Sequence, residues 1–144
     1  MAQLGVGFDC LDMVQGVVEY PVKASVTIAK GDALKDDGAG FAQLVTTSAT
    51  SSDFLGIAAS PANNGTGIDG AINVAIIPPL PQYKFYVYCG TGTLVPSDRG
   101  EFLAFKDEDE VDRTAAAPTT GYAPWVYAID TTNNYAYVMF RLAG

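Results

Sequence analysis

Hydrophobic and polar residues alternate along most of the chain, which is the pattern of β-strands with one buried side. In the run Ala71–Ile77, the residues Ile72, Val74 and Ile76 fall on one side of an extended chain, and two prolines end the run. Turns rich in glycine, asparagine and aspartate separate many such short runs, which is typical of a β-barrel or a β-sandwich. The other predicted strands are Val17–Val22, Val26–Ala29, Phe41–Val45, Phe54–Ala58, Tyr83–Tyr88, Glu101–Phe105, Trp125–Ile129 and Tyr135–Phe140.

The last two of these strands form the clearest local unit. Residues 130–134 between them are Asp, Thr, Thr, Asn and Asn, a turn-forming connection that predicts a β-hairpin. Helix signals are few. The best lies at Asp107–Ala117, where acidic residues come first, alanines follow and Pro118 ends the run, so we expect one or two helical turns there.

A weak internal repeat divides the chain into two similar halves, about 21–80 and 81–144. Gly31 is matched by Gly92, and Asp37 by Asp98 at the same spacing. Since a half this short cannot cover its own apolar side, we expect both halves to pack around one core. The sequence therefore predicts an all-β protein, with residues 21–144 forming a single small β-barrel or compact β-sandwich.

Residues 1–20 stand apart from both halves and predict an extended N-terminal arm. Glycines space its apolar side chains, and it lacks the basic and apolar regions of a secretory signal peptide. Two interpretations are open: an edge strand on the chain's own sheet, or an arm that adds a strand to a neighbouring subunit. The candidate inter-subunit contacts of this arm are Leu4, Val6, Phe8, Leu11, Val14 and Val17.

Composition argues against several functional classes. The 144 residues include no histidine, the commonest general base and the commonest zinc ligand, so we expect neither an enzyme nor a cofactor. A hydrolase that uses two of the 16 acidic residues is a third alternative, although no pair is singled out. The 8 basic residues are dispersed and the net charge is -8, which argues against nucleic acid as a partner. No apolar run reaches the roughly 18–20 residues that span a bilayer, so we expect no membrane partner.

Two further features have ordinary structural explanations. The acidic run Asp107–Asp112 departs from the calcium-binding loop pattern, so we expect a solvated loop or helix start and no metal. Cys10 and Cys89 are expected to be free thiols, because a chain without a secretory signal folds in a reducing compartment; a disulfide is the alternative.

Aromatic residues gather in the later predicted strands, and alternation places some of them on an outer side. Tyr86 and Tyr88 are candidate inter-subunit contacts in this group. Core packing, a protein interface and a carbohydrate platform all use such residues. The platform would be formed by Trp125, Tyr127 and Tyr137.

Four segments together carry a resemblance to a known family: Val26–Leu34, Asp53–Ala58, Gly121–Ala123 and Tyr135–Leu142. Their order of short strands and glycines, over roughly residues 20–142, resembles the small decoration, or cement, proteins of tailed-phage capsids. The resemblance implies a β-barrel-like subunit on the outer capsid surface that bridges neighbouring major capsid protein subunits.

The same resemblance implies partners and a place in the virion. Such proteins are commonly homotrimers, so further copies of the chain and the major capsid protein are the expected partners. The protein would be made in the host cytoplasm and located in the virion, with no catalytic residues. The alternative function is a carbohydrate-binding or fibre module that uses Trp125, Tyr127 and Tyr137.

Overall fold

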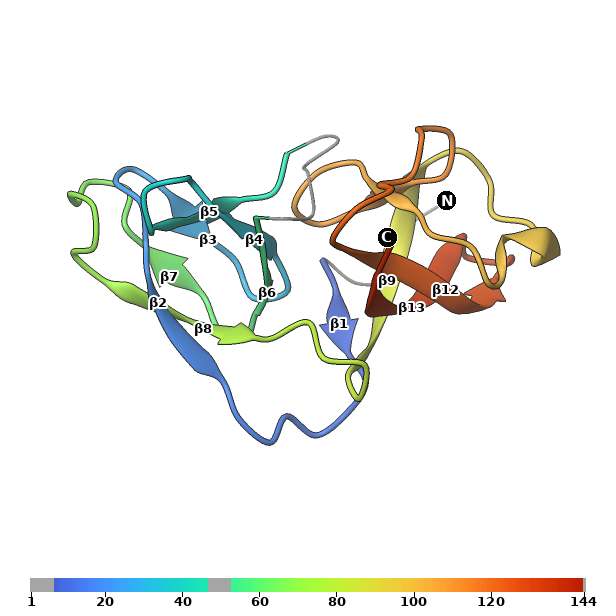
Figure 1. Cartoon of the computed structure of the whole chain (residues 1–144), viewed down its shortest axis with the longest axis horizontal. Helices are drawn as coiled ribbons and strands as arrows, with labels where there is room; N and C mark the ends of the chain where they lie inside the picture. The colour runs from blue at the N-terminus through green and yellow to red at the C-terminus, as the bar shows by residue number, and fades with distance from the viewer. Residues whose placement is uncertain (1–6, 47–52, 144) are drawn as a thin grey trace.

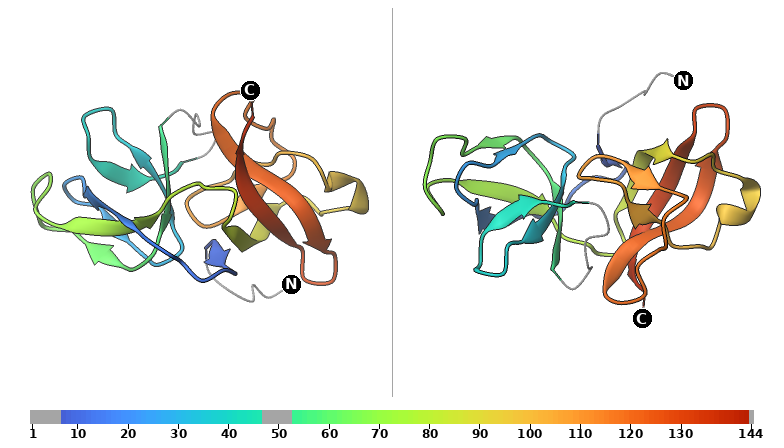
Figure 2. Two further views of the ribbon diagram at one scale, coloured as in Figure 1. Left: turned by 60° about the horizontal axis from the view of Figure 1, so that its bottom comes forward. Right: turned by 90° about the horizontal axis from the view of Figure 1, so that it is seen from above.

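Nearly all regular structure in the chain is β-strand, as the alternating pattern predicts (Figure 1). The computed structural model describes residues 7–46 and 53–143. Within these ranges one short 3-10 helix occurs, η1 (Pro96–Asp98), and no helix there has the length and apolar character to cross a bilayer. The strands form two larger sheets, which lie side by side along the long axis of the molecule in every view (Figure 1; Figure 2).

The first sheet is built from the N-terminal half and curls back on itself. Its neighbouring strands all pair antiparallel. A parallel bridge between Val22 and Ala42 places the residue after its first strand beside its last strand, so the two edges of the sheet meet there. Its strands, in spatial order, are β2 (Val18–Pro21), β8 (Asn73–Ile77), β6 (Phe54–Ala58), β4 (Ala33–Asp36) and β5 (Ala42–Leu44), and β3 (Thr27–Ile28) pairs separately with β7 (Ala62–Asn63).

The second sheet comes from the C-terminal half, with one strand from the N-terminal segment. Its centre is β9 (Lys84–Thr91), which pairs on one side with β13 (Tyr135–Leu142) and on the other with β1 (Asp9–Cys10). β12 (Tyr122–Asp130) pairs with β13 and confirms the predicted hairpin. Farther along β9 the parallel strand β11 (Val111–Asp112) joins the sheet.

Phenylalanine rings from both sheets form the centre of the molecule. The ring of Phe54 lies 4.7 Å from that of Phe140 and 5.4 Å from that of Phe105, measured between centroids. Phe8 and Phe85 lie 5.6 Å and 5.3 Å from Phe140, and all five side chains are buried. Since each buried phenylalanine contributes about 1.5–3 kcal/mol of transfer free energy, this cluster fixes the two sheets to each other.

The helix expected at Asp107–Ala117 is wrong. This segment is instead a bend between β10 (Ala104–Phe105) and β11, followed by irregular chain. The side chain of Asp107 accepts the N–H of Asp109, and the Asp112 carboxylate accepts the N–H of Thr114. Short acidic side chains here bind nearby backbone N–H groups, and this local bonding competes with a helix.

The proposed halves of the repeat correspond to the two sheets in part. β8 and β13 lie at matched positions of the repeat, and so do β5 and β10. The position matched to β4, however, leads into η1. Apart from β1, each sheet takes its strands from one half of the chain.

Candidate functional site

The N-terminal segment is anchored to the body of its own chain at Phe8. The Phe8 N–H donates to the Gly31 carbonyl at 2.8 Å, and the Phe8 side chain is only 1% exposed. Gly7 has a φ of +78°, and a Cβ there would lie 2.6 Å from the Gly31 oxygen, so this close backbone approach requires glycine. The next residues form β1 and pair with β9 of the same chain.

Residues 11–19, called the ribbon from here on, run along the surface from the end of β1 into the first two residues of β2 (Figure 1). Its backbone is tied to β9, because the Leu11 N–H donates to the Lys84 carbonyl at 2.8 Å and the Lys84 N–H donates to the Asp12 carboxylate at 2.6 Å. The Lys84 ammonium lies 3.0 Å from the other Asp12 oxygen. The backbone hydrogen bond and then the side-chain bond from Lys84 lower the pKa of Asp12, so the carboxylate is charged at neutral pH.

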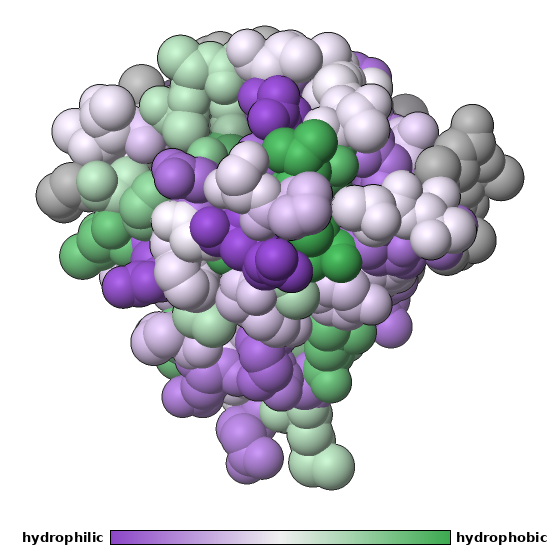
Figure 3. Space-filling view, turned by 90° about the vertical axis from the view of Figure 1, so that its right-hand side faces the viewer, coloured by the Kyte–Doolittle hydropathy of each residue, from purple (hydrophilic) through white to green (hydrophobic). Residues whose placement is uncertain are grey.

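Although the ribbon is held in place, all of its large apolar side chains except Val14 face solvent. Met13 is 82% exposed and Leu11 is 50% exposed, and Val17 and Val18 are exposed as well. Single exposed apolar residues are ordinary, but this grouping in one short segment is typical of a protein contact surface. At the end of the molecule formed by the second sheet, by comparison, apolar residues are interspersed with polar ones (Figure 3).

The candidate contacts of the N-terminal arm have different positions. Leu4 and Val6 lie outside the described residues. Phe8 is a core residue of its own chain, so its ring is unavailable on the surface, and Val14 is half-buried against the same core. Leu11 and Val17 are exposed members of the ribbon.

Tyrosines on the outer side of the second sheet form a row that we call the tyrosine face. Cross-strand pairing places Tyr88 opposite Tyr135, and Tyr86 opposite Tyr137. The centroids of Tyr86 and Tyr135 are 4.2 Å apart, and the two rings are stacked. The face consists of Tyr86, Tyr88, Tyr127, Tyr135 and Tyr137.

The rings of the tyrosine face are largely occupied with one another. Tyr135 is 1% exposed, although it lies on the outer side of the sheet. The Tyr86 hydroxyl donates to the Asp130 carboxylate at 2.9 Å, and burial followed by this bond raises the pKa of Tyr86. The candidate contacts Tyr86 and Tyr88 are therefore half-buried within their own sheet.

The three residues of the suggested carbohydrate platform do not share one flat surface. The Arg141 guanidinium lies 4.4 Å from the centroid of the Trp125 ring and covers one side of it, and the indole N–H donates to the Gly100 carbonyl at 3.1 Å. The rings of Tyr127 and Tyr137 are inclined by 53° to each other. A sugar stacks on an open aromatic side, which this arrangement offers only in part.

A cavity of about 340 Å³ lies at the C-terminal end of β13. Among the described residues, Pro81, Tyr122, Phe140 and Leu142 line it, together with the charged residue Arg141. Leu142 is 61% exposed. Within the described part of the chain, Arg141 makes no ion pair.

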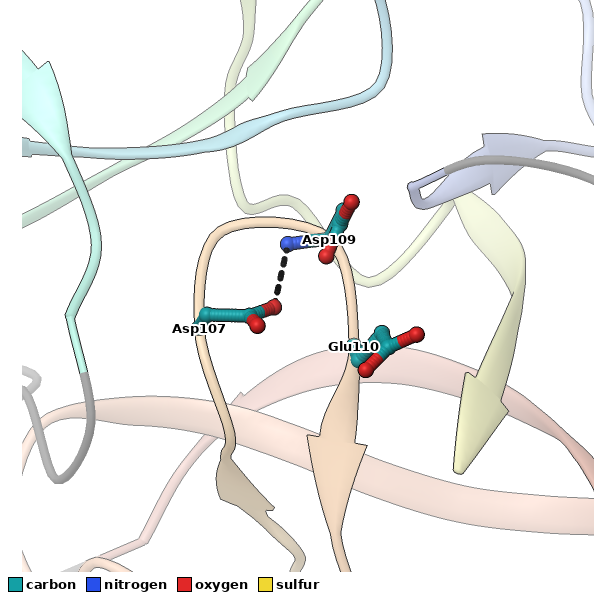
Figure 4. Close-up of side chains that lie close together, drawn as sticks. All are labelled: Asp107, Asp109 and Glu110. Atoms are coloured by element: carbon teal, nitrogen blue, oxygen red, sulfur yellow. Dashed lines mark hydrogen bonds between the residues drawn. The ribbon is translucent and has the colours of Figure 1, made fainter. Parts of the chain in front are cut away.

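The acidic run forms a tight bend in which Asp107, Asp109 and Glu110 lie close together (Figure 4). One carboxylate oxygen from each of the three lies within 4.8 Å of the others, so oxygen-preferring cations are the chemistry this bend could accept. Burial, then the hydrogen bond and charge of Asp107, raise the pKa of Asp109 to about 7. The Glu110 carboxylate is already paired with Lys106 at 3.1 Å.

Cys10 and Cys89 are free thiols, as expected. Sequence reasoning did not identify Lys84 or Arg141, because their contacts depend on partners far away in the chain. It also missed Met13, because the exposure of its side chain depends on how the whole chain folds. No family model matches the chain, and no curated protein or solved structure matches it either.

Proposed function

We propose that this chain is a structural protein that binds the outer surface of a phage capsid and stabilises it by bridging neighbouring major capsid protein subunits. In this proposal the protein acts in the virion as a homotrimer, carries out no chemical reaction and binds neither nucleic acid nor membrane. The two sheets would be the two similar halves of one barrel-like body. The arm expected at residues 1–20 would act through its exposed part, the ribbon, because Phe8, β1 and β2 anchor the rest of its described residues to the same chain.

The exposed ribbon is the observation that supports this proposal most. It is fixed to the body by β1, by Asp12 and by Lys84, yet it presents Met13 and Leu11 to solvent. A fixed apolar strip loses less conformational entropy on binding than a free tail does. Many such modest contacts, repeated around a symmetric shell, give tight attachment through multivalency.

The experiment uses capsids of the parent phage from which the decoration layer has been stripped. We expect the full chain to co-sediment with them in a saturable ratio and to raise their disruption temperature. A ribbon variant with Leu11→Ser, Met13→Ser and Val17→Ser should bind at least about tenfold more weakly, because three apolar contacts of roughly 0.5 kcal/mol each amount to that factor. Ile68→Ser is the matched control, since Ile68 is exposed outside the ribbon.

Two results would contradict the proposal. The first is an absence of saturable binding to stripped capsids. The second is binding by the folded ribbon variant that equals that of the control.

A further inference from the structure

We infer that the proton of Asp32 controls a contact between the two sheets: when the carboxyl group loses it, the acidic bend (residues 107–110) detaches from the start of β4. The bend connects β10 to β11 of the second sheet, whereas β4 belongs to the first sheet. This pH-sensitive contact is a property of the fold and does not depend on whether the protein binds a capsid.

Asp32 lies at the point where the bend is joined to the first sheet. The N–H of the next residue, Ala33, donates to the backbone carbonyl of Glu108 in the bend at 2.7 Å. The backbone carbonyl of Asp32 accepts the N–H of Ala58, the last residue of β6, at 2.8 Å. A change in the charge of the Asp32 side chain therefore acts directly beside the hydrogen bond that joins the bend to β4.

The Asp32 carboxyl group is buried and has little to neutralise it. The residue is only 5% exposed. One carboxyl oxygen accepts the Ala29 N–H at 2.8 Å, and the other has no hydrogen-bond partner among the residues that the structure describes. None of the ion pairs in the same part of the chain includes Asp32. Burial without a paired cation destabilises the charged form of a carboxyl group.

The bend adds negative charge beside this buried group. Burial first, and then the charges of Glu108 and Asp107, raise the pKa of Asp32 to about 6, against the opposing effect of the Ala29 N–H. Asp107 belongs to the crowded group of carboxylates in the bend (Figure 4). The bend is thus the part of the surroundings that repels a charged Asp32.

Nearby basic residues do not cancel this repulsion. Lys106, which precedes the bend, is paired with Glu110 at 3.1 Å. Lys30, on the same turn as Asp32, is exposed and makes no ion pair with it. Among the other segments bonded to this turn, β6 has no charged residue, and the N-terminal segment brings the exposed Asp9, which is also negative.

Loss of the proton leaves a buried charge that faces like charges. Movement of the bend away from β4 relieves the repulsion, admits water to the carboxylate and breaks the hydrogen bond between Ala33 and Glu108. Because β10 and β11 have only two residues each, this movement can stay local. The attached form holds the proton more tightly, so the contact has its full stability below the ordinary aspartate pKa of 3.8 and loses it as the pH rises through about 6.

Hydrogen exchange of the Ala33 N–H, followed by NMR, reports whether the bend detaches. All buffers contain EDTA, so that no bound cation can replace the proton. We expect the Ala33 N–H to be less protected than the Val22 N–H, which donates to the Ile72 carbonyl away from the bend and exchanges through wider unfolding. The protection of Ala33 should fall about tenfold between pH 5 and pH 8, because the pKa of Asp32 is about 6 in the attached form and returns toward 3.8 in the detached form.

Three variants assign the fall to Asp32. Asp32→Asn should abolish it, because the amide keeps an oxygen for the Ala29 N–H but carries no charge. Asp53→Asn is the matched control: Asp53 is an exposed aspartate, and the fall should remain. Glu108→Gln should make the fall smaller, and it decides the result if Asp32→Asn does not fold.

Three results would overturn the inference. Equal protection of Ala33 and Val22 at every pH would mean that the bend opens only when the whole sheet unfolds. A fall of less than about threefold would mean that the proton of Asp32 does not control the contact. An undiminished fall in a folded Asp32→Asn protein, or in Glu108→Gln where Asp32→Asn does not fold, would assign the pH dependence to another group.

Discussion

Replacing Phe8 by alanine tests whether the start of the chain belongs to its own core. The Phe8 ring is 1% exposed and lies 5.8 Å from Phe105 and 5.6 Å from Phe140. Buried Phe→Ala changes cost about 3–5 kcal/mol, so we expect the free energy of unfolding to fall by about 3 kcal/mol or more. For a domain of this size, that loss lowers the melting temperature by roughly 10 °C.

The assay is thermal and urea unfolding of the Phe8→Ala protein, followed by circular dichroism. Leu11→Ala is the matched control, because Leu11 is half-exposed and its truncation should shift the melting temperature by no more than about 2 °C. The reasoning is refuted if Phe8→Ala unfolds at the original temperature while self-association or capsid binding is lost. That result would place Phe8 at an inter-subunit contact.

Three further predictions concern stability. Gly56→Ala should lower the free energy of unfolding in urea by about 3 kcal/mol or more, because Gly56 has a φ of +137° and an added Cβ would collide with the Ile77 oxygen. A smaller decrease would contradict this prediction and would mean that the strand shifts to make room for the Cβ. Asn64→Ala should lower the free energy of unfolding by about 1–2 kcal/mol in the same assay. The buried amide donates to the carbonyls of Val22, Lys23 and Ile68, and mainly the Lys23 carbonyl loses its donor, because the other two also accept backbone N–H groups. A change below about 0.5 kcal/mol, on the order of a surface substitution, would contradict this. Burial is the main cause that raises the pKa of Asp32 to about 6 and of Asp109 to about 7, so the folded state binds protons more tightly than the unfolded state. The free energy of unfolding should therefore fall as the pH rises from about 4 to 7, as measured by the midpoints of urea unfolding. In an Asp109→Asn variant this fall should be smaller.

Local periodicity located most of the strands that carry the core, but it missed β4, whose Ala33 and Leu34 are buried. β6 has the predicted bounds Phe54–Ala58, and the hairpin formed by β12 and β13 follows its turn residues. Strands of two residues, such as β1 and β7, are too short to show any period. The pattern of acids followed by alanines predicted a helix after Asp107, and it failed because the side chains of Asp107 and Asp112 bond the local backbone.

The candidate surfaces could be predicted only as residue types. Apolar residues before position 20 indicated a contact segment, but the sequence does not show that Phe8 turns inward while Met13 turns outward. That division follows from contacts between distant parts of the chain, such as the Phe8 ring against Phe105 and Phe140. The tyrosine face was suggested by alternation in two strands, yet the burial of Tyr135 follows from stacking across those strands.

The contacts that the ribbon makes within its own chain give it little stabilisation. Fixing the backbone of one residue costs roughly 1–2 kcal/mol, and few hydrogen bonds offset that for the ribbon. The Asp12–Lys84 pair lies at the surface, with the two side chains 26% and 39% exposed, so it contributes only modestly to stability. Met13 and Leu11 gain almost nothing from their present positions, since their surfaces stay in water. A second protein surface that covered these two side chains would remove their apolar area from water and so stabilise the complex. The rings of the tyrosine face already cover one another, so a partner would gain less there. We therefore propose the ribbon, and not the tyrosine face, as the adhesive surface.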